Sequence, residues 1–218
     1  MQEIDINQNV MDDNDRIALE VKGILKNRNI FCVNMISSPG AGKTTFLEKI
    51  LNALKKNVKC AVIEGDMTTT IDRDRLLPAC DEVYQINTDT FGGDCHLSAF
   101  MIKDALTKMN LSEVKLMIIE NVGNLICPAD FLIGEDQKIV LYSVTEGEDK
   151  PLKYPVSFNV ADIIIVTKTD LLPHLDVSKD KIYENIKKVN SRAEIFFTSA
   201  KTGEGIDKFV DYIKSKLY

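Results

Sequence analysis

The sequence predicts an α/β fold built on a mostly parallel sheet of about seven strands, with helices on both faces of the sheet. Short apolar runs, typical of strands buried on both faces, recur along the chain, and several are separated by segments with apolar residues at helical spacing. A Gly-rich turn also joins the first apolar run to a helical pattern, and units of this kind belong to parallel sheets.

The individual elements follow from these two patterns. The predicted strands are the apolar, β-prone runs at residues 30–36, 58–63, 83–86, 116–120, 139–144, 163–167 and 195–198. The predicted helices cover a segment that begins after Asp13-Asn14, a segment after the Gly-rich turn, and residues 97–109, 179–189 and 206–217. At 218 residues the chain suits one α/β domain. We therefore expect an N-terminal helical segment at residues 1–28 and a single domain at residues 29–218.

Composition excludes several classes of protein. The chain has 33 acidic and 27 basic residues, a net charge of −6, and no basic stripe, so we expect no nucleic-acid partner. It shows no leader pattern, and its apolar runs are too short to cross a bilayer, so we expect a soluble, cytoplasmic protein without a membrane partner. Five cysteines argue against a disulfide framework: Cys32 and Cys60 lie in strand runs, and Cys80 is expected to be a buried thiol.

Residues 37–45, with the sequence SSPGAGKTT, form the most specific motif. Between a strand and a helix, this pattern predicts the phosphate loop of a P-loop NTPase. Lys43 is expected to reach the β- and γ-phosphates, and the Thr44 hydroxyl to bind Mg²⁺. Ser37 stands where the first glycine of the motif is usual. The predicted phosphate-binding residues are Ser38, Pro39, Gly40, Ala41, Gly42, Lys43, Thr44 and Thr45.

Carboxylates end the second and fourth predicted strands, and two of them complete the expected catalytic set with Lys43. Glu120 lies three residues before Gly123, so we expect Glu120 to hold Mg²⁺, usually through water, and the Gly123 N–H to bind the γ-phosphate. Asp66 is a candidate for a second Mg²⁺ contact or for positioning the attacking water. A surface carboxylate in a loop is the alternative for Asp66.

The segment after the strand at 163–167 predicts the base. Asp170 can accept hydrogen bonds from both N1–H and the 2-amino group of guanine, which adenine cannot offer. Lys168 is expected to lie along the ring, and the Ala200 N–H to meet O6. Thr167 replaces the usual Asn, which predicts one shortened or lost contact. The expected base-binding residues are Lys168, Asp170, Ser199, Ala200 and Lys201, and the nucleotide is GTP.

The motifs together resemble those of HypB, the family of GTPases that incorporate nickel into hydrogenase. The resemblance rests on residues 37–45, 64–66, 93–97 (GDCHL), 120–128 (ENVGNLICP) and 199–203. It implies a GTPase that forms a homodimer with nucleotide and binds nickel or zinc at the subunit interface through Cys95, His96 and Cys127. It also implies action beside other hydrogenase maturation proteins to load nickel into the hydrogenase large subunit.

The same three residues indicate a metal site by their chemistry, because two thiolates and an imidazole suit Ni²⁺ or Zn²⁺. Cys95 and His96 are adjacent, so their side chains diverge in regular structure unless a bend intervenes or a two-fold axis doubles the ligands. Asp94 can cap a helix whose first turn would contain Cys95 and lower the pKa of its thiol. Unrelated cysteines and a surface histidine are the alternative. Residues 1–30 contain no Cys or His, so we expect no separate N-terminal nickel site.

The two predicted sites lie close together in the sequence. At about 3.5 Å per residue, Cys127 is at most ~14 Å along the chain from Gly123. Our hypothesis is that the GTP state orders this segment and favours the metal site, whereas the GDP state loosens it. No arginine finger is recognisable, so intrinsic turnover is expected to be on the order of 10⁻⁴ to 10⁻² per second.

Three other functions share some of these features. A GTPase that matures urease or a cobalamin-dependent mutase is one, although the Cys-Pro-His element expected of the urease type is missing. A small-molecule kinase with Asp66 as its base is the second. The third is a metal-binding interaction protein in which nucleotide only stabilises the fold.

Overall fold

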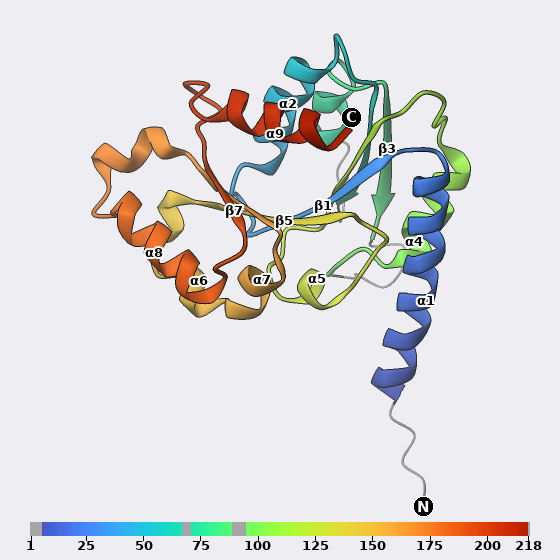
Figure 1. The fold of residues 1–218 in the computed structure, drawn as a ribbon, viewed down its shortest axis with the longest axis horizontal. Helices are drawn as coiled ribbons and strands as arrows, with labels where there is room; N and C mark the ends of the chain where they lie inside the picture. The colour runs from blue at the N-terminus through green and yellow to red at the C-terminus, as the bar shows by residue number, and fades with distance from the viewer. Residues whose placement is uncertain (1–5, 67–70, 89–94, 218) are drawn as a thin grey trace, which may run out of the picture.

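The computed structural model describes residues 6–66, 71–88 and 95–217, with the side chains of 6–12, 66, 71 and 72 left aside. These residues form one parallel seven-stranded sheet with helices on both faces (Figure 1), as the sequence predicts. The strands are β1 (Phe31–Ser37), β2 (Cys60–Asp66), β3 (Glu82–Asn87), β4 (Leu116–Glu120), β5 (Gln137–Ser143), β6 (Ile163–Thr167) and β7 (Glu194–Phe197). The α-helices are α1 (Ile6–Asn27), α2 (Lys43–Leu54), α3 (Ile71–Leu76), α4 (Ala99–Lys108), α5 (Cys127–Asp130), α6 (Lys150–Lys153), α7 (Pro155–Val160), α8 (Lys179–Val189) and α9 (Ile206–Leu217), and the 3₁₀ helices are η2 (Val144–Glu146) and η3 (Thr169–His174).

The strand order β3-β2-β4-β1-β5-β6-β7 places β1 at the centre. Its Asn34 is level with Ile119 of β4 on one side and with Lys138 of β5 on the other. Because the strands are parallel, all their carboxyl ends meet at one edge of the sheet, where ligands of such sheets bind. The segments that follow β1, β4 and β6 therefore lie at the same edge.

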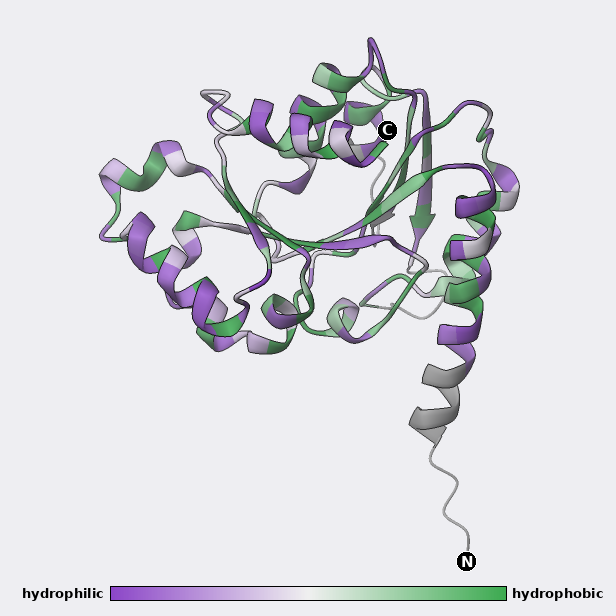
Figure 2. Ribbon diagram, viewed as in Figure 1, coloured by the Kyte–Doolittle hydropathy of each residue, from purple (hydrophilic) through white to green (hydrophobic). Residues whose placement is uncertain are grey.

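Alternating residues of β1 supply two separate cores. Val33 and Met35 face the layer of α2 and α9, whereas Cys32 faces the layer that contains α1 and α4. Aromatic rings strengthen the first core: Phe46 of α2 and Phe209 of α9 meet edge to face with centroids 5.2 Å apart. Figure 2 shows the same division, with apolar residues along the strands and polar residues on the outward faces of the helices.

Helix α1 begins at Ile6, so the predicted start after Asp13-Asn14 is wrong. Asn14 resembles a capping residue in the sequence, but its side chain serves tertiary contacts. Its Nδ2 donates to the carbonyl of Leu132 at 2.8 Å, and its Oδ1 accepts from the N–H of Ala99 at 3.0 Å. Asn14 thus fastens α1 to the start of α4, along which α1 runs in Figure 1.

The predicted helices at 179–189 and 206–217 have the bounds of α8 and α9. Helix α4 starts at Ala99, and its N-cap is Ser98, whose side chain accepts from the N–H of Met101. Cys95 therefore lies outside the helix, and the prediction that it occupies the first helical turn is wrong; Asp94 lies outside the described residues. Over the part of the chain that is described, no helix is long and apolar enough to cross a membrane.

Candidate functional site

The phosphate loop joins β1 to α2 through two glycines in the left-handed region. Gly40 has φ 71°, and Gly42, the N-cap of α2, has φ 94°, conformations that glycine adopts without steric cost. The twelve-residue helix α2 then directs the N–H groups of its first turn and its positive dipole end toward the loop. A cavity of about 380 Å³ opens here, lined by Gly40, Ala41, Gly42, Lys43, Thr44, Thr45, Arg75, Glu120 and Lys168. It can surround a chain of phosphates.

Two side-chain contacts position the reactive groups of this cavity. The Lys43 ammonium donates to Ser37 Oγ at 2.8 Å, so the serine at the unusual position orients the lysine. The Thr44 hydroxyl donates to Glu120 Oε1 at 3.1 Å in a buried setting. A hydroxyl and a carboxylate this close form the hard oxygen donor set that Mg²⁺ prefers. Thr44 and Glu120 would hold Mg²⁺ here, and the ion would supply positive charge to the β- and γ-phosphates.

The other predicted γ-phosphate residues lie at the same edge. A side chain at Gly123 would lie 3.6 Å from the Cα of Pro39, so the backbone after β4 passes close against the phosphate loop. Asp66 ends β2, and its backbone is level with Asn87 of β3. The side chain of Asp66 lies outside the described atoms, and its role stays a prediction.

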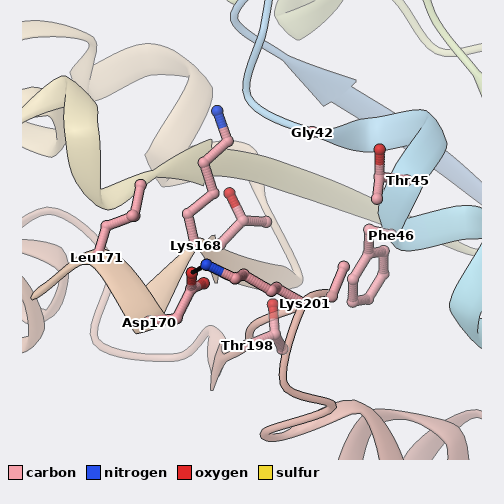
Figure 3. Close-up of a pocket in the computed structure, with 10 residues that line it drawn as sticks. Gly42, Thr45, Phe46, Lys168, Asp170, Leu171, Thr198 and Lys201 are labelled. Atoms are coloured by element: carbon pink, nitrogen blue, oxygen red, sulfur yellow. Dashed lines mark ion pairs between the residues drawn. The ribbon is translucent and has the colours of Figure 1, made fainter.

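The base pocket lies beside the phosphate cavity and has a volume of about 280 Å³. Figure 3 shows Asp170 and the ring of Phe46 on opposite sides of the pocket, with the Lys201 side chain extending between them toward Asp170. Asp170 Oδ1 accepts from Ser199 Oγ at 2.6 Å, and Lys201 approaches Oδ2 at 4.0 Å. The Lys168 ammonium donates to the Gly40 carbonyl at 2.8 Å, so its stem spans from β6 to the phosphate loop. The remaining lining residues are Gly42, Thr45, Thr167, Leu171, Thr198 and Ala200.

Thr167 keeps a direct contact with the phosphate loop. Its hydroxyl lies 2.6 Å from the Ala41 carbonyl and 3.2 Å from that of Tyr142. Thr167 therefore links the base-binding end of β6 to the phosphate loop. The contact that Thr in place of Asn is predicted to shorten or lose stays a prediction. The turn after β7 is built around Gly205, where a Cβ would lie 2.1 Å from the Phe197 carbonyl oxygen.

Cys95 and His96 come together at a bend that precedes α4. Cys95 Sγ lies 3.9 Å from His96 Nδ1. In a tetrahedral zinc site, sulfur and nitrogen ligands lie about 3.5 Å apart, so small rotations bring both atoms to one ion. The bend thus allows adjacent residues to share an ion, which regular structure would prevent. The His96 ring stacks on Phe131, with centroids 4.1 Å apart.

Cys127 is the first residue of α5 and is half-buried. Among the described residues of one chain, no three His, Cys, Asp or Glu side chains lie close enough to hold one metal ion. The structure therefore brings Cys95 and His96 together within one chain but does not gather all three predicted ligands. A tetrahedral metal site that includes Cys95 and His96 therefore needs further ligands besides these two side chains.

The other cysteines are structural. None of the five cysteines, all of which lie in described segments, forms a disulfide. Burial raises the pKa of the Cys60 thiol to about 12 and that of Cys80 to about 11. Cys80 is half-buried rather than fully buried, and its thiol donates to the carbonyl of Cys60 at 3.1 Å. These thiols stay protonated at neutral pH and are poor metal ligands.

The structure also shows residues that sequence reasoning missed. Arg75 of α3 lines the phosphate cavity and donates to Thr45 Oγ1 at 3.1 Å, so an arginine does reach this site. Asn121 and Asn124, on either side of Gly123, both bond to the segment that carries Cys95 and His96. Their signal in the sequence was two amide side chains flanking the glycine of the ENVGN motif.

The fold and the paired cavities define a P-loop nucleotide-binding protein, and the comparisons below place it among GTPases. The family model of the CobW/HypB/UreG nucleotide-binding domain matches residues 31–197. Hydrogenase maturation factor HypB of Escherichia coli K12 is 43% identical over 213 residues, which cover 98% of this chain and 72% of that protein. Probable hydrogenase maturation factor HypB of Methanocaldococcus jannaschii is 36% identical, covering 98% of this chain and 96% of that protein. The chain belongs to the HypB branch of this family.

Solved structures agree with this assignment. HypB from Archaeoglobus fulgidus superimposes with a TM-score of 0.87 at 35% identity, covering 94% of this chain and 99% of that one. HypB from Helicobacter pylori in complex with nickel superimposes with a TM-score of 0.86 at 37% identity, covering 94% of each chain.

Proposed function

We propose that this GTPase is a nickel carrier for hydrogenase maturation, in which two copies of the chain hold the metal between them and GTP hydrolysis controls its release. It acts beside other maturation proteins and delivers nickel to the hydrogenase large subunit. The observation that carries the proposal is the pair of donors Cys95 Sγ and His96 Nδ1, 3.9 Å apart and connected to the segment that follows the Gly123 loop. Thiolate ligands persist in a reducing compartment, so we place the protein in the cytoplasm.

The nucleotide roles follow from the two cavities. Lys43 and the N–H groups of the phosphate loop bind the β- and γ-phosphates, and Thr44 with Glu120 holds Mg²⁺. Asp170 selects guanine by accepting two hydrogen bonds from its edge. Water attacks the γ-phosphate to give GDP and phosphate, and we assign Asp66 to orient that water or to contact Mg²⁺. The Gly123 N–H then loses its phosphate partner.

The metal site is completed by symmetry. One chain offers Cys95, His96 and Cys127, and a two-fold axis through this surface doubles them to six donors. Six donors suffice for two tetrahedral ions if a thiolate bridges or water completes the shells. Two thiolates and an imidazole accept Zn²⁺ as well as Ni²⁺, so zinc is the competing cargo. The solved structure of HypB from Helicobacter pylori in complex with nickel supports nickel as the cargo.

Sedimentation of the metal-free protein with Mg²⁺ and a non-hydrolysable GTP analogue, with and without Ni²⁺, tests this proposal. We expect a dimer that retains nickel in the unmodified protein, and loss of nickel from Cys95→Ser and Cys127→Ser. Cys80→Ser is the matched control, because its thiol is protonated and half-buried away from the ligands. Nickel bound equally well by all four proteins, or bound by monomers alone, would contradict the shared site.

Hydrolysis without an acceptor separates this function from its rivals. Single-turnover release of phosphate from GTP and water alone is expected of a regulatory GTPase. A small-molecule kinase would instead consume GTP only when an acceptor is added and would transfer the phosphoryl group to that acceptor, whereas a protein that uses nucleotide as a structural ligand would leave GTP intact. Thr167 to Asp170 and Ser199 to Lys201 serve base selection, which a kinase acceptor site does not need.

A further inference from the structure

Asn124 connects the segments of both proposed metal-binding cysteines. It follows Gly123 directly, and its Oδ1 accepts from the N–H of Ile126, the residue before Cys127, at 2.8 Å. Its Nδ2 donates to the Cys95 carbonyl oxygen at 3.4 Å. The partly exposed side chain of Asn124, directly after Gly123, therefore contacts the backbone of Cys95 and the backbone just before Cys127.

Asn121 makes a second connection from the other side of Gly123. Its Oδ1 accepts from the N–H of Leu97 and from that of Val122, both at 3.0 Å, and the side chain is 1% exposed. Leu97 follows His96 directly. The two asparagines thus hold the Cys95 to Leu97 backbone at both of its ends.

A buried polar chain extends the connection to α5. Asn121 Nδ2 donates to Asn34 Oδ1 at 3.2 Å, and Asn34 Nδ2 donates to Glu135 Oε1 at 3.2 Å. The Lys138 ammonium lies 3.6 Å from Glu135 and donates to the carbonyls of Ala129 and Phe131 at 2.8 and 3.0 Å. Phe131 is the ring on which His96 stacks. The four side chains of this network, those of Asn121, Asn34, Glu135 and Lys138, are polar and buried. Buried polar groups in folded proteins are nearly always hydrogen-bonded, as these are.

We propose that Asn121 and Asn124 are positioning residues that carry the nucleotide state from Gly123 to the metal ligands. When the γ-phosphate is lost and the Gly123 backbone moves, the two amides move with it. Cys95, His96 and Cys127 then lose the spacing that binds metal. This inference rests on the proposed nickel site and adds the residues that couple it to GTP.

The test is the ratio of nickel dissociation constants in the GDP state and in the GTP-analogue state, measured by calorimetry on the full chain with Mg²⁺. In Asn124→Asp, the carboxylate still accepts from Ile126 but no longer donates to Cys95. Asn110→Asp is the matched control, because Asn110 makes the same local bond, to the Ser112 N–H at 3.2 Å, with no contact to the metal surface. Single-turnover GTP hydrolysis and the unfolding midpoint are measured alongside.

We expect the ratio to fall by about three- to tenfold in Asn124→Asp, the effect of one hydrogen bond, with hydrolysis unchanged and the unfolding midpoint lowered by no more than the loss of one partly exposed hydrogen bond accounts for. In Asn110→Asp the ratio should equal that of the unmodified protein. Asn121→Asp retains an acceptor for the Leu97 N–H, so its ratio of nickel dissociation constants should fall less than that of Asn121→Ala. An unchanged ratio in Asn124→Asp, or an equal loss in Asn110→Asp, would overturn this inference and leave the nickel site standing. A ratio of one in the unmodified protein would instead overturn the proposed control by GTP, and this inference with it.

Discussion

The hydroxyl of Thr167 donates to the carbonyl of Ala41 at 2.6 Å. Thr167 ends β6, and Ala41 lies in the phosphate loop between its two left-handed glycines. Through this bond, the part of the protein that selects the base also holds the part that binds the phosphates. A base in its pocket therefore meets a phosphate loop that is already in position.

Replacing Thr167 by valine keeps the side-chain volume and removes this bond. We expect the free energy of unfolding to fall by about 1–2 kcal/mol, because a buried hydrogen bond is lost, and GTP affinity to fall with it. Urea denaturation and fluorescence titration measure the two effects. Thr198→Val is the matched control: Thr198 also lines the base pocket, but its hydroxyl donates to the Val166 carbonyl at 3.4 Å and not to the phosphate loop. Equal effects in both variants would contradict a special role for the Ala41 contact.

Asp170→Asn tests base selection. The amide donates where the carboxylate accepted, so two charge-assisted hydrogen bonds to guanine are lost, and we expect at least about a 100-fold loss of GTP affinity. Xanthosine triphosphate, whose 2-oxo group can accept from the new amide, should bind better than GTP. Competition against a fluorescent guanine nucleotide gives both constants. Asp176→Asn makes the same charge change at an exposed position and should change neither. Retained preference for GTP in Asp170→Asn would show that another group selects the base.

Gly205→Ala tests the turn that presents Ala200 to the base. Gly205 has φ 71°, and its new Cβ would lie 2.1 Å from the Phe197 carbonyl oxygen. Gly203 has φ 86° with no atom within 4 Å, so Gly203→Ala carries only the left-handed cost of about 1–2 kcal/mol. We expect Gly205→Ala to cost roughly 1–3 kcal/mol more in unfolding free energy because of the added overpacking. Equal unfolding midpoints in urea for the two variants would count against this packing.

The pH dependence of thiol alkylation tests the distinction between the buried thiols of Cys60 and Cys80 and the exposed thiol of Cys95. A raised pKa means less thiolate at a given pH, so Cys60 and Cys80, with pKa values of about 12 and about 11, should react slowly with iodoacetamide at pH 7–9. Their labelling should increase about tenfold per pH unit throughout that range, since it lies below both values. Exposed Cys95 should be labelled first. Mass spectrometry of the peptides gives each rate, and labelling of Cys80 as fast as Cys95 would be inconsistent with this environment.

Features that depend on residues close together in the sequence could be predicted, whereas features that depend on distant contacts could not. The strands and helices α8 and α9 follow from apolar periodicity, and the phosphate loop from glycines at fixed spacing, so these predictions are confirmed. The start of α1 was missed because Asn14 looks like a cap but bonds to Leu132 and Ala99, contacts that only the folded chain creates.

The candidate site divides in the same way. Lys43, Thr44 and Glu120 were predicted from motifs and meet around one cavity. Arg75 could not be predicted, because it reaches the cavity from a short helix without a recognisable pattern. The contacts of the asparagines around Gly123 were also missed, because the ENVGN motif places two amides beside the glycine but does not show which groups they bond to. Their function depends on partners more than twenty residues away in the sequence.

Control of the metal site by GTP is best measured by a nickel titration. Metal-free protein with Mg²⁺ is titrated by calorimetry in the presence of a non-hydrolysable GTP analogue or of GDP, with Cys95→Ala as the control. We expect tighter nickel binding with the GTP analogue than with GDP, and loss of that binding in Cys95→Ala. Equal affinity in the two nucleotide states would contradict it, because a nucleotide that does not change the affinity for nickel cannot control its release.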